Sequence, residues 1–147
     1  MTEPVRARIH IAAPPERVFE FFTRPEGLTA WMGEHAELEP TPGGRFAVNV
    51  RGAPVRGAYQ VLEPPHRLVV TWGYAGSDTL PPGASTVEFR LTDEAGGTLV
   101  EVEHRDLPAG DQPGHDEGWH HYLDRLGRVV VDGAAGPDHG HEGRSRS

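Results

Sequence analysis

Apolar and polar residues alternate along residues 5–11, where every second side chain is apolar and arginine or histidine stands between them. A repeat of two residues is typical of a half-buried strand, so we expect one there. The period changes over residues 13–23, where Val18, Phe19 and Phe22 recur at helical spacing behind two prolines, which the first turn of a helix tolerates. A short helix should therefore follow the first strand.

A second short helix is predicted over residues 26–32, where Leu28 and Trp31 stand three apart and Gly33 is suited to end it. The chain then becomes rich in strand patterns separated by Gly, Pro and Asp. Six strands are expected, over residues 35–40, 43–52, 55–63, 67–74, 85–93 and 98–106. The short turns EAGG and EPPH between them favour an antiparallel meander.

A long amphipathic helix is predicted over residues 116–133. Its apolar positions, among them Trp119 and Tyr122, recur at helical intervals, and Gly133 is suited to end it. The preceding segment, residues 107–114, is interpreted as a loop because of its Pro and Gly content.

These elements divide the chain into one domain over residues 1–132 and a tail over residues 133–147. The tail is polar and rich in glycine, so it cannot bury much apolar surface. We therefore expect the tail to be disordered.

Composition narrows the classes of function. The formal net charge is −8 and the 14 basic residues are scattered arginines, so we expect no nucleic-acid partner. The chain has no cysteine, which removes disulfides and thiolate metal sites. No apolar run reaches the length that a membrane span requires. We expect a cytoplasmic protein without membrane insertion and without a cofactor.

Two features of the sequence are similar to those of a known protein family. One is the order of the predicted elements, and the other is a set of four stretches: IAAPPERVFEFFTRPEGLTAWMG, GGRFAVNVRG, PPHRLVVTWGY and GWHHYLDRLG. The sequence resembles the START-like (SRPBCC) superfamily, and within it the bacterial branch similar to the C-terminal domain of the Hsp90 ATPase activator. The resemblance covers about residues 3–132. It implies an α+β helix-grip fold: a curved antiparallel sheet of about seven strands, two short helices, and a long C-terminal helix over the concave face.

The resemblance also implies a ligand cavity between sheet and helix, which relatives use for lipid transfer, polyketide cyclisation, hormone sensing or regulation. Met32 stands where members of this branch often carry a second tryptophan. The wall at the mouth of the pocket is therefore expected to be less rigid, because methionine is a flexible side chain. We expect the protein to have no counterpart of the additional N-terminal domain of the eukaryotic co-chaperones. For this reason we do not expect stimulation of Hsp90.

Strand alternation places Trp72 and Tyr74 on the face of residues 67–74 that points toward the helix, and His104 on the inner face of residues 98–106. Aromatic residues on a strand are usually core, and a buried histidine is usually a structural hydrogen bonder. In a pocket, however, His104 could donate to a ligand carbonyl or act as a general acid or base. All three are candidate ligand-binding residues, and His104 is the candidate catalytic residue.

Three further aromatic residues are candidates for the same cavity. Trp119 and Tyr122 lie on the long helix, and Trp31 lies in the second short helix. The alternative interpretation is that they anchor the helices to the sheet.

The histidines do not form a recognised metal pattern. His115 and His120 are five residues apart, which puts them on different faces of a helix. His139 and His141 are close together in the tail, but two neighbouring histidines are a weak signal. We therefore expect no metal.

Three functions remain open. The first is non-catalytic binding of a small hydrophobic or amphipathic molecule in an internal cavity. The second is a polyketide cyclase or dehydratase type of enzyme, in which a pocket histidine moves a proton. The third is a co-chaperone or regulatory interaction module that acts through its surface. An exposed edge strand would also allow a homodimer.

Overall fold

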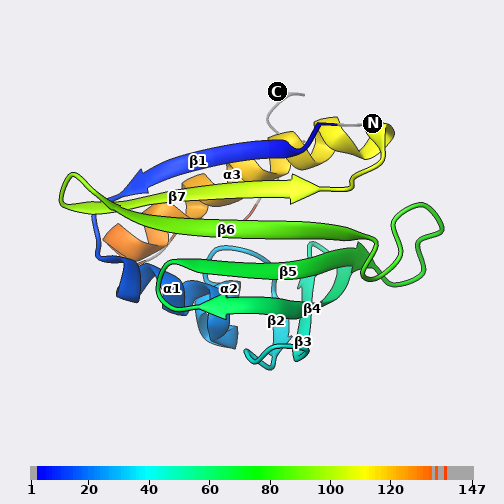
Figure 1. Ribbon diagram of the computed structural model, residues 1–147, viewed down its shortest axis with the longest axis horizontal. Helices are drawn as coiled ribbons and strands as arrows, with labels where there is room; N and C mark the ends of the chain where they lie inside the picture. Colours follow the sequence, from blue (N-terminus) through cyan, green and yellow to red (C-terminus); the bar gives the residue numbers. More distant parts are fainter. Residues whose placement is uncertain (1–2, 134, 136–137, 139–147) are drawn as a thin grey trace.

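In the computed structural model, which describes residues 3–133, 135 and 138, seven antiparallel strands form one curved sheet (Figure 1). Their order across the sheet is β1-β7-β6-β5-β4-β3-β2. The strands are β1 (Val5–Ile11), β2 (His35–Leu38), β3 (Arg45–Val50), β4 (Ala53–Glu63), β5 (Arg67–Tyr74), β6 (Ser85–Glu94) and β7 (Gly97–Arg105). All seven strands were predicted, the first from its alternation and the other six from strand patterns separated by Gly, Pro and Asp.

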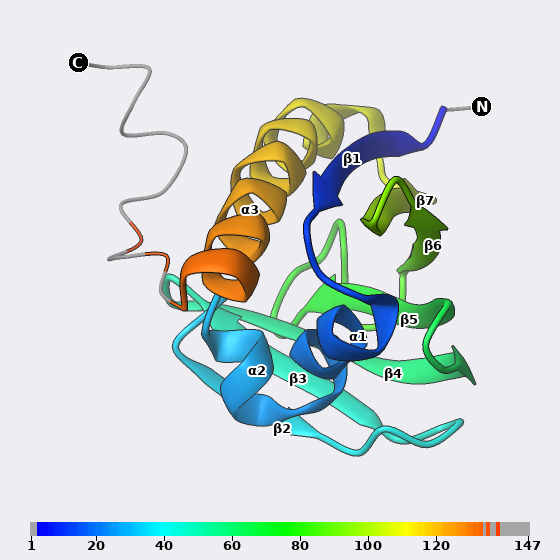
Figure 2. The same cartoon turned by 90° about the vertical axis from the view of Figure 1, so that its left-hand side faces the viewer.

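Three α-helices lie on the concave side of the sheet (Figure 2). They are α1 (Pro15–Thr23), α2 (Pro25–Thr29) and α3 (Gln112–Asp132), and a 3-10 turn, η1 (Ala109–Asp111), leads into α3. Helix α3 packs mainly against β1, and Gly133 ends it in the left-handed conformation with a φ of 85°. This arrangement confirms the predicted α+β helix-grip fold.

The prediction of a loop over residues 107–114 was wrong in its second half, because α3 begins at Gln112. Pro113 stands in the first turn, where a helix makes no use of the missing amide proton. Composition alone therefore placed the start of the helix too late. The second short helix was predicted to be too long at its C-terminal end. Helix α2 ends at Thr29, three residues before the predicted end.

The predicted strand faces agree with the observed burial. Apolar residues of β1 face the core, whereas Arg6 and Arg8 are exposed. In β7, His104 lies on the same inward face as Val100 and Val102 and is fully buried. The face assignments therefore hold for the strands that carry the candidate site residues.

The space beneath the helices is filled by packed aromatic rings. Phe22 of α1 contacts Trp31 edge to face at a centroid distance of 5.3 Å and Phe89 at 4.7 Å. Phe89 in turn contacts Trp119 at 5.5 Å. Such rings bury a large apolar area, and their edge-to-face contacts add to it. The centre of the grip is therefore a solid core.

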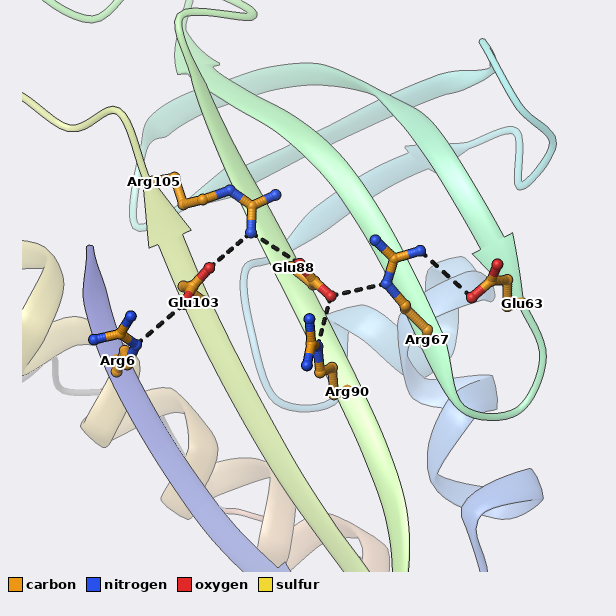
Figure 3. A network of polar contacts seen from close by, with 7 residues as sticks. All are labelled: Arg6, Glu63, Arg67, Glu88, Arg90, Glu103 and Arg105. Atoms are coloured by element: carbon orange, nitrogen blue, oxygen red, sulfur yellow. Dashed lines mark hydrogen bonds and ion pairs between the residues drawn. The ribbon is translucent and has the colours of Figure 1, made fainter. Parts of the chain in front are cut away.

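The convex face of the sheet carries a network of ion pairs, shown in Figure 3. At its centre lies the carboxylate of Glu88, whose side chain is only 5% exposed. It accepts hydrogen bonds of 2.8 Å from Arg67, 2.7 Å from Arg90 and 2.8 Å from Arg105. Burial alone would raise the pKa of Glu88, but these three guanidinium groups outweigh it and lower the pKa to about 2.

Two residues of the predicted tail lie against the domain. Ala135 packs at the edge of the core. The carboxylate of Asp138 accepts a 2.6 Å hydrogen bond from the hydroxyl of Tyr122 and lies 2.9 Å from Nε2 of His121. Apart from Gly133, which ends α3, the rest of the predicted disordered tail lies outside the described residues.

Candidate functional site

A cleft of about 560 Å³ opens between the N-terminal half of α3 and strands β3 to β5. Its sheet wall is largely apolar, with Val50, Val55 and Trp72 among the lining residues. Trp119 and Tyr122 of α3 line the opposite wall. Because the core behind it is packed, the pocket is a cleft at one end of the grip.

The cleft stays open because glycines line the helix side. Gly110, Gly114 and Gly118 are spaced four residues apart and all line the cleft. A Cβ atom built at Gly110 or at Gly114 would meet no heavy atom within 4 Å. Larger side chains at these positions would extend into the cleft.

A chain of hydrogen bonds lies at the end of the cleft near the start of α3. Nδ1 of His115 is 2.9 Å from the backbone carbonyl of Asp111, and Nε2 is 2.9 Å from the hydroxyl of Tyr74. Since a carbonyl can only accept, Nδ1 of neutral His115 carries the proton and Nε2 accepts the proton of Tyr74. Burial raises the pKa of Tyr74, so the hydroxyl stays protonated.

A second chain runs behind the cleft through His104. The indole Nε1 of Trp119 donates to Nδ1 of His104 over 3.0 Å, and Nε2 of His104 lies 2.8 Å from Oγ of Ser85. The Ser85 hydroxyl donates to the backbone carbonyl of Trp72 over 2.8 Å. Each proton therefore has a defined acceptor, and Nε2 of His104 must donate to Ser85.

His104 is held neutral by this environment. Its side chain is fully buried, and burial together with the nearby imidazole of His115 lowers its pKa to about 3. Both ring nitrogens are engaged, and His104 does not line the cleft. This geometry favours the structural interpretation of His104 over the role of a general acid or base.

Of the six candidate residues, four line the cleft: Trp72, Tyr74, Trp119 and Tyr122. His104 supports the wall from behind. Trp31 is absent from the lining and is fully buried, with its indole donating to the carbonyl of Phe21 over 2.9 Å. The helical period placed Trp31 on an inward face, but it could not tell the core from the cleft a few residues away.

Several lining residues were not named as candidates in the sequence, among them His115, Arg51 and Asp111. His115 was weighed only as a metal ligand. Arg51 lies in the turn between β3 and β4. It is exposed, but it also lines the mouth of the cleft. The spacing of glycines 110, 114 and 118 was the one signal that could have indicated a cleft along this helix.

The shape of this mouth depends on Glu34. Its two carboxylate oxygens accept hydrogen bonds from the backbone amides of Arg51 and Gly52, over 3.0 Å and 2.9 Å. Both turn residues have positive φ, 50° for Arg51 and 85° for Gly52. Glu34 therefore stabilises a turn conformation that an arginine rarely adopts.

Residues 3–133, 135 and 138 contain no group of three His, Asp or Glu side chains that could hold a metal ion. His139 and His141 lie outside the described residues. None of the described helices combines the length and the apolar character needed to cross a bilayer.

Solved structures with the same fold come from several bacteria. An AHSA1-like protein from Rhizobium etli is 47% identical, with a TM-score of 0.73 over 92% of this chain and 86% of its own. CalU16 from Micromonospora echinospora is 31% identical, with a TM-score of 0.71 over 85% of this chain and 74% of its own. DynU16, encoded in the dynemicin biosynthetic locus, is 25% identical, with a TM-score of 0.79 over 92% of this chain and 49% of its own.

The sequence also matches human "Activator of 90 kDa heat shock protein ATPase homolog 1", with 28% identity over 109 residues. That match covers 74% of this chain and 31% of the human protein, so the chain spans about a third of the curated relative. The family model of the Activator of Hsp90 ATPase homolog 1-like proteins matches residues 12–130. The chain therefore belongs to this family.

Proposed function

We propose that the protein binds a small, largely apolar molecule in the cleft between α3 and strands β3 to β5. The observation that carries the proposal is a cleft of about 560 Å³ that combines apolar walls with a few defined polar groups. Binding sites for small molecules have this composition and a volume of roughly 300–1,000 Å³. Catalysis through His104 is not part of the proposal, because both of its ring nitrogens are engaged.

The three tryptophans allow a direct test. The side chains of Trp72 and Trp119 line the cleft, whereas Trp31 lies in the core with its indole N–H bonded to Phe21. In a ¹⁵N NMR titration with 2-methoxynaphthalene, the indole signals of Trp72 and Trp119 should shift together. The signal of Trp31 should stay in place and serve as the internal reference.

A variant that fills the cleft completes the test. Gly114→Leu places a side chain in open space in the cleft, and a helix accepts leucine better than glycine. We expect Gly114→Leu to lose the titration. The matched control is Glu117→Leu, which adds the same side chain at an exposed position of the same helix outside the cleft. Equal binding by the two variants would contradict the proposal.

Native mass spectrometry of the freshly purified protein would identify the class of the natural ligand. A stoichiometric apolar adduct released on denaturation supports the proposal. A clean mass of the chain alone would favour a ligand that binds transiently.

A second candidate function is action on an Hsp90-type ATPase, which the name of the human relative suggests. Such action would use the surface, and it would leave ATPase stimulation intact in the Gly114→Leu variant. Measuring Hsp90 ATPase rates with the wild type and with this variant separates the two candidates. The homodimer and the cytoplasmic location stay predictions.

A further inference from the structure

The end of the cleft near the start of α3 presents hydrogen-bond acceptors. Tyr74 gives its only proton to Nε2 of His115, because Nδ1 of His115 gives its own proton to the carbonyl of Asp111. The oxygen of Tyr74, a residue that lines the cleft, is therefore left as an acceptor. The backbone carbonyl of Asp111 cannot donate, and it therefore sets the direction of both hydrogen bonds.

As an acceptor, the Tyr74 oxygen makes only a long hydrogen bond with the described residues. Its one donor is Nε1 of Trp72, at 3.4 Å, which is beyond the usual N–H···O range of 2.7–3.2 Å. A ligand donor could therefore approach at normal length without displacing a good bond.

The surrounding charge also favours a donor. Asp111 lines this end of the cleft, and its carboxylate adds to the effect of burial in raising the pKa of Tyr74. The negative potential that opposes ionisation of Tyr74 would also oppose a ligand carboxylate or phenolate there. The cleft lining also contains a cation, Arg51. It lies at the mouth, in the turn after β3, and so belongs to a different segment from Asp111, which precedes α3.

We propose that this end of the cleft takes the hydroxyl group of a neutral phenol, which donates its proton to the oxygen of Tyr74 while its ring lies against Trp72 and Trp119. This inference rests on the proposed binding function and names its ligand class. Flat aromatic rings suit the cleft because two indoles line it with their ring contact at 5.3 Å. A carbonyl or an ether would bring only lone pairs toward the lone pairs of Tyr74.

The test compares 2-naphthol with 2-methoxynaphthalene, which has the same rings and no donor. One net hydrogen bond corresponds to about threefold to tenfold in affinity, so 2-naphthol should bind the wild type tighter by about that factor. In Tyr74→Phe the two ligands should bind equally. Tyr59→Phe is the matched control, since the hydroxyl of that residue donates to the carbonyl of Phe22 in the core and does not line the cleft, and it should keep the preference.

His115→Phe gives a second and opposite readout. Without Nε2 of His115, the proton of Tyr74 is free to point into the cleft and to bind an acceptor. The variant should therefore gain affinity for 2-acetonaphthone, a ketone, relative to the wild type. A purely structural role of His115 would weaken all three ligands alike.

Each outcome decides a separate claim. If both naphthalenes bind the wild type equally, the cleft binds apolar molecules but the phenol inference is wrong. If the preference survives in Tyr74→Phe, the inference is also wrong. If neither ligand shifts the indole signals of Trp72 and Trp119, the proposed binding function fails and the inference fails with it. Circular dichroism and thermal unfolding would verify that each variant is folded.

Discussion

Trp119 donates a 3.0 Å hydrogen bond from its indole to Nδ1 of His104, joining α3 to β7 inside the core. The bond fixes the tautomer of His104, because a nitrogen that accepts from an indole cannot carry a proton itself. The other nitrogen then donates to Ser85. His104 thus acts as a connector between the helix and the sheet.

His104→Ala should destabilise the fold. The change leaves a cavity and deprives the indole of Trp119 of its acceptor, and large-to-small changes in a core cost about 2–5 kcal/mol. Urea unfolding of the wild type and the variant measures the difference. A variant that is as stable as the wild type would remove the connector role.

Stability should also depend on pH through His104. Its pKa is about 3 in the folded protein, against an ordinary value of 6.5, so the unfolded chain binds the additional proton between these values. The free energy of unfolding should therefore fall as the pH drops from 7 to 5, by about 2 kcal/mol from this residue at 1.36 kcal/mol per pKa unit. Urea unfolding at pH 7, 6 and 5 measures this slope.

The control for this pH dependence is His104→Gln, which cannot be protonated. This variant should show a shallower loss between pH 7 and 5, because the other histidines are the same in both proteins. Identical slopes would mean that His104 does not remain neutral in the folded state.

Glu88→Gln should weaken the convex face of the sheet. The amide cannot compensate the charges of Arg67, Arg90 and Arg105, and a loss of about 1–3 kcal/mol in unfolding free energy is expected at pH 7. The matched control is Glu63→Gln, since Glu63 is exposed and meets Arg67 at 3.4 Å, where a surface pair is worth about 0–1 kcal/mol.

Acid should remove the contribution of Glu88. Its pKa is lowered from 4.5 to about 2, so the stabilisation is present above pH 4.5 and is lost as the pH falls from 4.5 to 2. Over this range the wild type should lose more stability than Glu88→Gln does. Parallel acid-unfolding curves followed by circular dichroism would contradict this assignment.

Two glycines should respond to alanine in opposite directions. Gly114→Ala should stabilise the protein by about 0.5–1 kcal/mol, because a Cβ atom there meets nothing within 4 Å and alanine favours helix. Gly73→Ala should destabilise it, because its Cβ atom would overlap the backbone carbonyl oxygen of Pro81. Thermal unfolding of the pair measures both signs, and a stable Gly73→Ala would contradict the packing of the β5–β6 connection.

The fold could be predicted from the sequence because β1 and β7 alternate clearly and Gly, Pro and Asp separate the other strands. A period of two assigns each side chain to a face, so the inward position of His104 in β7 followed from its neighbours. The predicted tight turn at EAGG is confirmed, since Ala95 and Gly96 both have positive φ there.

The site was predicted only in part, because burial and access to the cleft look alike in a hydrophobic pattern. Trp31 and Trp119 both carry the signature of an inward aromatic residue, yet only Trp119 reaches the cleft. His115 was tested only against the spacing of a metal site. The pairing of His115 with Tyr74 joins residues 41 positions apart, and no local pattern encodes such a distance.

Because Glu34 stabilises the turn after β3, a substitution at Glu34 could change which molecules enter the cleft. Arg51 at the mouth of the cleft keeps its position through a residue that is itself no part of the lining. Substitution at Glu34 would release the Arg51–Gly52 turn from its strained conformation and redirect the arginine, while every wall residue stayed the same. Related proteins with identical linings could therefore admit different molecules, and a search for specificity that compares only the walls would overlook the cause.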